Sequence, residues 1–290
     1  MLKEDFVPVA IDQWYQRRQQ DAEGEFYRKV AKQGPRKDMQ QTTQGRYICT
    51  SSGNLLGYNN NRGPERLKAI MKRTLVRVRP AEPDTQPLTS TTPDPIAMQK
   101  PSPETIVVGV SSKILSGYKP TKNWKSAFHD SVGRDNLWIL KEEVPELIKL
   151  SQTGGNIPER IAKRIVRFHL VDNTRGEPPR WSNKQIRDLK IKVDDKGALR
   201  GKVHLETESG DRGYAAELFG IIKSENEKLT RFDIVAKGDF WGVGKYTPNA
   251  PKGKFPLVVA FRIVDRKDPA DLLMPHGAKG WPPGYFKSEQ

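Results

Sequence analysis

The chain has 290 residues, with 50 Lys and Arg against 35 Asp and Glu, a net charge of +15 and a mean hydropathy of −0.72. A single cysteine, Cys49, excludes an intramolecular disulfide, a CxxC redox pair and a cysteine-rich metal site. No apolar run is long enough to form a transmembrane segment, and no signal peptide is readable near the N-terminus. We therefore expect a cytoplasmic protein by default, or an exported one if an N-terminal piece is missing. The charge favours anionic partners, although it is also compatible with a generally basic soluble protein.

The first elements expected are a short strand over residues 6–12 and a helix over residues 21–34. The segment FVPVAID is apolar enough to be a buried strand. Asp21 is suited to cap the helix, which should end near Pro35.

A hairpin and a helix follow over residues 44–78. Tyr47–Cys49 and Leu55–Tyr58 are typical of two short strands, and the turn between them contains Gly53, which tolerates a positive φ. Pro64 stands where proline is preferred, in the first turn of a helix. The helical spacing of apolar side chains then predicts one buried stripe, formed by Leu67, Ile70, Met71, Leu75 and Val78.

The order strand, helix, hairpin, helix over residues 5–78 resembles the thioredoxin fold, most specifically at the hairpin and the last helix. In that family the central strand, here residues 6–12, leads into a CxxC motif whose thiol is activated by a helix N-terminus. The corresponding segment Trp14–Gln19 has no thiol, and Gln44–Arg46 stand where the family carries its cis-proline. The resemblance thus implies a thioredoxin-like module without thiol–disulfide exchange. Cys49, inside a predicted strand, is expected to be a buried, unreactive side chain.

Residues 79–103 are predicted to form a flexible Pro-rich linker, because seven prolines fall between Pro80 and Pro103. An ordered Pro-rich ligand segment is the alternative. Beyond it, residues 104–285 form a second domain that resembles β-rich domains of uncharacterised bacterial proteins.

The second domain is predicted to be an antiparallel barrel or sandwich, so that the whole chain is of the α+β class. Short helices are expected at residues 145–150 and from Pro158, and the turn Asp194–Gly197 is a strong hairpin signal. The predicted strands cover residues 105–110, 136–140, 165–171, 189–193, 199–206, 213–222, 230–237 and 255–264.

The last helix of the first domain should present a row of cations opposite its apolar stripe, and aligned cations are what phosphate contacts require. A solvated helix face is the alternative. The predicted polyanion-binding residues are Arg62, Arg66, Lys72, Arg73 and Arg77.

In the second domain, a polar loop at residues 172–177 follows a predicted strand, where it could bind a ligand or activate water, or could simply cap its own backbone. Nearby aromatic residues would line a groove for a polysaccharide or a peptide. The predicted groove residues are Asp172, Arg175, Glu177, Trp181, Trp241 and Tyr246.

The sequence shows no nucleophile set, phosphate loop or metal-ligand spacing, and its histidines, His129, His169, His204 and His276, are expected to be structural. We therefore predict no catalytic residues, metal or cofactor. The leading hypothesis is a non-enzymatic binding or scaffold protein with a protein or an anionic polymer as its partner. The alternatives are nucleic-acid or other polyanion binding through residues 62–79, and a hydrolase centred on residues 172–177.

Overall fold

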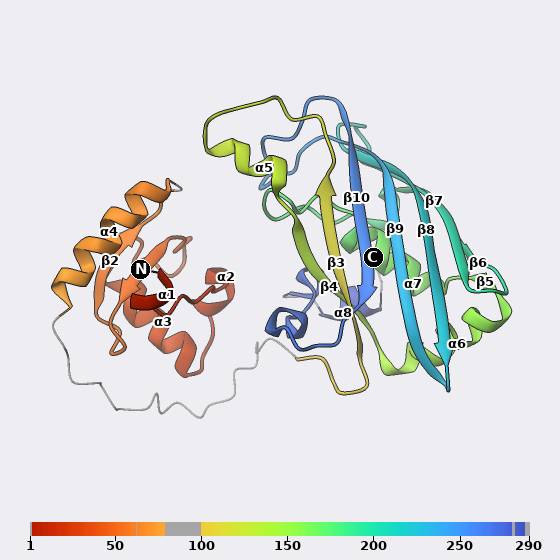
Figure 1. The fold of residues 1–290 in the computed structure, drawn as a ribbon, viewed down its shortest axis with the longest axis horizontal. Helices are drawn as coiled ribbons and strands as arrows, with labels where there is room; N and C mark the ends of the chain where they lie inside the picture. Colours follow the sequence, from red (N-terminus) through yellow and green to blue (C-terminus); the bar gives the residue numbers. More distant parts are fainter. Residues whose placement is uncertain (1, 62, 79–99, 280–281, 288–290) are drawn as a thin grey trace. The chain divides into compact units, whose positions relative to one another are not determined.

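The computed structural model describes residues 2–61, 63–78, 100–279 and 282–287. The chain divides into two compact units, Met1–Ala97 and Met98–Gln290 (Figure 1). Residues 79–99, most of the predicted linker, lie outside the described residues. Among the described helices, none has the length and apolar character that a membrane span requires.

Unit 1 contains four helices and one hairpin within its described residues. The elements are α1 (Leu2–Asp5), α2 (Gln13–Gln16), α3 (Ala22–Lys32), β1 (Arg46–Cys49), β2 (Leu55–Asn59) and α4 (Pro64–Arg77).

Three local signals in unit 1 act as the sequence predicted. Asp21 caps α3, with its Oδ1 accepting a hydrogen bond from Gly24 N at 3.0 Å. β1 and β2 pair antiparallel, and Gly53 in their connection has φ of +82°. Pro64 is the first residue of α4. The hairpin and both predicted helices are therefore confirmed.

The predicted strand at residues 6–12 is wrong. These residues lie outside any helix or strand, and Val7 and Val9 are 89% and 75% exposed. Pro8 between them has no backbone N–H to donate to a sheet. The thioredoxin resemblance remains a prediction: the expected hairpin and last helix are present, whereas the strand expected at residues 6–12 is not.

Unit 2 is built on one open antiparallel sheet of eight strands, in the order β4-β3-β10-β9-β8-β7-β6-β5. Its elements are β3 (Ile106–Ile114), α5 (Ala127–Asp130), β4 (Gly133–Ile139), α6 (Val144–Thr153), β5 (Gly155–Asn156), α7 (Glu159–Arg164), β6 (Ile186–Val193), β7 (Ala198–Glu206), β8 (Gly213–Glu225), β9 (Lys228–Trp241), β10 (Lys254–Ile263) and α8 (Pro282–Phe286). The predicted hairpin around Asp194–Gly197 is confirmed as β6–β7.

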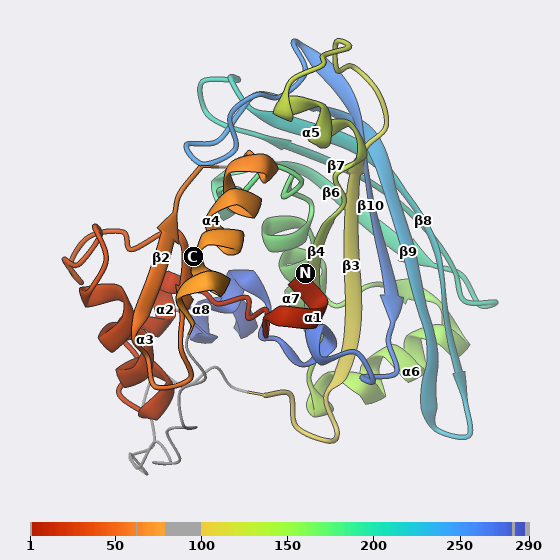
Figure 2. The ribbon, with the colours of Figure 1, turned by 60° about the vertical axis from the view of Figure 1, so that its left-hand side comes forward.

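The sheet curves around α7, and α6 packs against β8 and β9 (Figures 1 and 2). Inward-facing side chains such as Leu218, Ile234 and Phe261 form the core with those of α7. The prediction of an antiparallel β-rich domain is confirmed, but the barrel or sandwich is corrected to a single sheet that does not close. Because helices cover the inner face, the sheet needs neither closure nor a second sheet to bury its apolar side.

The predicted strand at residues 165–171 is also wrong. Residues Ile165–His169 continue α7 as one turn of π-helix, in which Leu170 N donates to Ile165 O at 3.2 Å. Every side chain from Ile165 to Val171 is buried. The polar side chains of this segment are interior as well: Arg167 Nε donates to Trp181 O at 3.1 Å.

Candidate functional site

Helix α4 is held on the hairpin by a close approach to β2. A Cβ placed on Gly57 would lie 2.9 Å from Thr74 Cγ2 and 3.1 Å from Ile70 Cγ2, so only glycine leaves the helix this near. Met71 and Thr74 are buried on the same side of α4. This packing fixes which face of the helix points away from the hairpin.

The outward face of α4 is basic. Five described cations on it are exposed, and Glu65 is the helix's only acidic residue; the cations are Arg66, Lys68, Lys72, Arg73 and Arg77. None of these five forms an ion pair with the described part of the chain. The predicted Arg62 lies outside the described residues. The structure thus leaves a row of cations unneutralised, as phosphate contacts require.

The loop at residues 172–177 is cross-linked internally. Arg175 pairs with the Asp172 carboxylate through Nε, at 3.1 Å, and through Nη2, and its Nη1 donates to the backbone oxygens of Thr247 and of Pro248, the latter at 2.8 Å. Thr174 Oγ1 donates to Asp172 Oδ1 at 2.6 Å. Both members of the ion pair are buried, and Arg175 also binds the backbone of the loop that contains Thr247 and Pro248, so the pair joins two loops. The Asp172 carboxylate is therefore not free to bind a ligand.

The predicted groove residues separate into interior and surface groups. Trp181 is fully buried: its Nε1 donates to Leu170 O at 2.9 Å, and the Arg212 guanidinium lies 3.9 Å from its ring centroid. Burial lowers the pKa of Arg212 to about 10. Like Asp172 and Arg175, Trp181 is therefore too buried to line an open groove.

The other three predicted groove residues reach solvent. Glu177 Oε1 lies 3.6 Å from His276 Nε2, and the Glu177 side chain is 65% exposed. Trp241 is half-buried beneath Lys254, whose Nζ is 4.7 Å from the ring, and Tyr246 is 59% exposed. The structure brings residues 172–177 against the loop that carries Tyr246, but half of the predicted set is interior.

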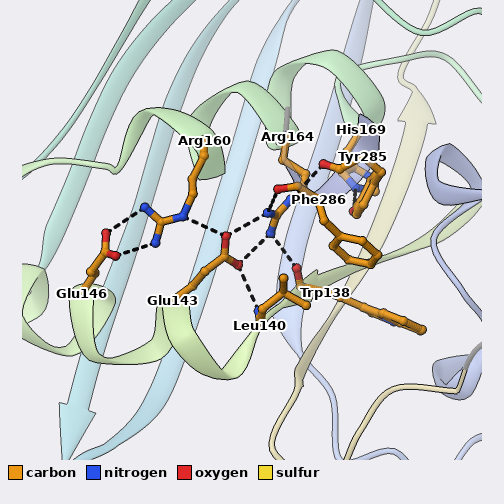
Figure 3. Close-up of polar contacts among 9 residues, drawn as sticks. All are labelled: Trp138, Leu140, Glu143, Glu146, Arg160, Arg164, His169, Tyr285 and Phe286. Atoms are coloured by element: carbon orange, nitrogen blue, oxygen red, sulfur yellow. Dashed lines mark hydrogen bonds and ion pairs between the residues drawn. The ribbon is translucent and has the colours of Figure 1, made fainter. Parts of the chain in front are cut away.

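Sequence reasoning did not find a buried network between α7 and the C-terminal segment (Figure 3). Glu143 Oε2 and Oε1 accept from Arg164 Nη1 and Nη2 at 2.7 and 2.8 Å, with both side chains almost fully buried. Arg164 Nη1 and Nη2 also donate to Trp138 O at 3.0 Å and Phe286 O at 2.7 Å. Arg160 extends the network from Glu143, at 3.2 Å, to Glu146 near the surface.

A second chain of buried polar groups ends at the same segment. His169 Nε2 lies 2.6 Å from Tyr285 Oη, and His169 Nδ1 lies 3.1 Å from Asp135 Oδ2. Burial by itself raises the pKa of Asp135, but the hydrogen bond and charge of His169, with two backbone hydrogen bonds, bring it below its usual value. Burial raises the pKa of Tyr285 well above its usual value.

These two networks have structural rather than ligand-binding geometry, because their groups, apart from Arg160 and Glu146 near the surface, are buried and lie against one another or against backbone oxygens. Together they fasten α8 to the interior of unit 2. The sequence carried one signal for them: Arg160 and Arg164 are four residues apart on one helix face, and Glu143 and Glu146 are three apart. Nothing in that spacing indicated that the two pairs meet.

The histidines are not grouped for metal binding. Within the described ranges, no cluster of three or more His, Cys, Asp or Glu side chains is arranged to hold a metal ion. His169 is packed in the core, as expected of it, although on a π-helical turn. Cys49 is half-buried, and burial raises the pKa of its thiol.

Of the sites predicted from the sequence, the basic face of α4 and the groove residues Glu177, Trp241 and Tyr246 therefore remain accessible to a ligand. Comparisons of the chain with protein-family models, with curated proteins and with solved structures found no match.

Proposed function

We propose that this chain is a non-enzymatic binding protein that engages a polyanion through the exposed face of α4. The observation that carries the proposal is the set of five exposed cations on a helix whose opposite side is packed on β2. Arg66, Arg73 and Arg77, at offsets 0, 7 and 11, lie on one side of the helix and can contact successive phosphates. A redox-inactive thioredoxin-like module remains the proposed description of unit 1.

The alternative of a hydrolase centred on residues 172–177 is not carried forward. The Asp172 carboxylate accepts hydrogen bonds from Thr174 and Arg175, so it is not available as a general base. Glu177 is exposed, and within the described residues its one ion-pair partner is His276.

The proposal is tested by measuring how tightly the full chain binds heparin and labelled DNA over a range of salt concentrations. The variant Arg66→Glu/Arg73→Glu should bind at least about tenfold more weakly, because two contacts become repulsive. It should also show a shallower dependence of log K on log salt, by about 0.7 per lost contact on a single strand.

The matched control is Lys37→Glu/Lys252→Glu, which changes the net charge by the same amount at two exposed loop positions. Equal weakening in both double variants would mean that only total charge matters, and would refute a site on α4. Undetectable binding by the unmodified chain at low salt would refute polyanion binding altogether.

A further inference from the structure

Two cross-strand pairs of like charge lie side by side on the hairpin β6–β7. In the antiparallel register, Lys190 is directly opposite Lys202, and Lys192 is directly opposite Arg200. All four side chains are exposed, whereas Ile191, between the two lysines of β6, is buried. The four cations, hereafter the cationic quartet, therefore share the outer face of the sheet.

The quartet is crowded. Two residues along a strand rise about 6.6 Å, and neighbouring strands are about 4.8 Å apart. The Cα atoms of the four cations thus lie at the corners of a rectangle of about 6.6 by 4.8 Å. Like charges directly opposite each other destabilise a strand pair. This arrangement is unfavourable for folding unless an anion neutralises it.

Neighbouring carboxylates neutralise the quartet only in part. Lys190 Nζ lies 3.6 Å from Asp188 Oδ1, and Lys202 Nζ lies 3.8 Å from Glu217 Oε1, with the lysine side chains 77% and 74% exposed. Ion pairs between such exposed side chains contribute little to stability, so they offset only a small part of the repulsion within the quartet. Lys192 and Arg200 have no carboxylate partner in the part of the chain that the structure describes.

An exposed aromatic ring adjoins the quartet on the same face. Phe219 pairs with Arg200 across β7–β8, is 38% exposed, and has the Arg200 guanidinium 4.7 Å from its ring centroid. The next residue across the sheet is Val235, which is 41% exposed. The face therefore places cations for phosphates next to a partly exposed aromatic ring, over which the Arg200 guanidinium lies.

We propose that the outer face of β6–β8 binds single-stranded nucleic acid, with phosphates on the quartet and a base stacked on Phe219 once the Arg200 side chain has moved from the ring to a phosphate. Sequence-tolerant single-strand sites combine these two elements, a positive track and an aromatic platform. In a duplex the base faces are already stacked and cannot reach Phe219. This site goes beyond the proposed function of α4, because it lies on the other unit and has its own ligand class.

The test uses the full chain and a fluorescein-labelled, mixed-sequence single-stranded DNA, with the matching duplex and with phosphatidylserine vesicles as competitors. The chain carries Arg66→Glu/Arg73→Glu throughout, so that binding through α4 does not contribute. Lys192→Gln/Arg200→Gln should lower the salt slope by about 1.4. Phe219→Thr should weaken single-strand binding about fivefold or more and leave duplex binding unchanged.

The control Lys149→Gln/Lys252→Gln removes two exposed cations from α6 and a loop, and is expected to keep the parent slope. The quartet variant should unfold at the same or a higher temperature than its parent, because repulsion is relieved; weaker binding then cannot be ascribed to misfolding. Equal effects of quartet and control variants, equal loss for single strand and duplex, or preferred competition by the vesicles would each overturn the assignment. None of these results depends on whether α4 binds a polyanion.

Discussion

The substitution Glu143→Gln should be one of the most destabilising single changes in unit 2. It removes the charge opposite Arg164, whose side chain is fully buried and whose only carboxylate within ion-pair distance in the described chain is Glu143. Breaking a buried pair by removing one partner costs about 3–5 kcal/mol, because the remaining charge is left uncompensated. Arg164 keeps its backbone acceptors, Trp138 O and Phe286 O, so we expect the lower end of that range.

The matched control lies in the same network. Glu146→Gln removes the outer partner of Arg160, and because these side chains are 48% and 37% exposed the cost should stay below about 1 kcal/mol. Urea unfolding followed by tryptophan fluorescence reports on unit 2, since Trp138 and Trp181 are buried there. If both variants lose the same small amount of stability, the interior pair is not carrying an uncompensated charge and the reasoning fails.

Three further changes test other contacts. Tyr285→Phe removes the Oη partner of His169 and should lower the free energy of unfolding by about 1–2 kcal/mol. Tyr285→Ala should lower it by about 3–5 kcal/mol, because this variant also leaves a cavity. Urea unfolding measures both values, and equal losses would contradict the hydrogen bond. Asp135 has a folded-state pKa below its usual value, so its contribution to stability is present above the unfolded pKa and is lost as pH falls through the folded pKa. The acid unfolding of Asp135→Asn should therefore lack this pH-dependent loss of stability. An acid unfolding profile identical to that of the unmodified chain would contradict the expectation. Cys49 has a raised pKa, so iodoacetamide should alkylate the native chain at neutral pH more slowly than the urea-unfolded chain, and equal rates would contradict the burial.

Local signals predicted most elements of both units, because they act over a few residues. The aspartate cap of α3, the proline at the start of α4 and the glycine turn between β1 and β2 each satisfy a nearby backbone requirement. The same holds for the turn Asp194–Gly197, where Asp194 Oδ1 accepts from Lys196 N at 2.9 Å and from Ala198 N at 2.8 Å.

The two wrong strands failed for opposite reasons. Residues 6–12 have an apolar strand-like composition, but Val7 and Val9 are exposed. Residues 165–171 are all buried, polar Arg167 and His169 included, so no face is left exposed to solvent and the sequence shows no helical period of polar and apolar residues. Composition alone cannot distinguish these cases, because what decides each one is whether a distant segment packs against it.

The candidate sites divide in the same way. Asp172, Arg175 and Trp181 were selected as a polar and aromatic cluster, which describes equally well a ligand site and a buried cross-link. What settles their positions is the contact of Arg175 with Thr247 and Pro248, more than seventy residues away. The network of Glu143, Arg164 and the C-terminal segment has still longer range, and the local spacing of its arginines and glutamates did not indicate that these residues meet.

The cationic quartet is stronger evidence for an anionic ligand than the basic face of α4. Exposed lysines and arginines on a helix are ordinary, since side chains on one face can spread into solvent at little cost. Two directly opposed like-charge pairs in one hairpin are unusual, because the strand register holds the like charges close together. The turn Asp194–Gly197 fixes that register, which places Lys192 opposite Arg200. What the structure adds is the partly exposed ring of Phe219 beneath Arg200, the aromatic group that a single-strand site needs beside its cations.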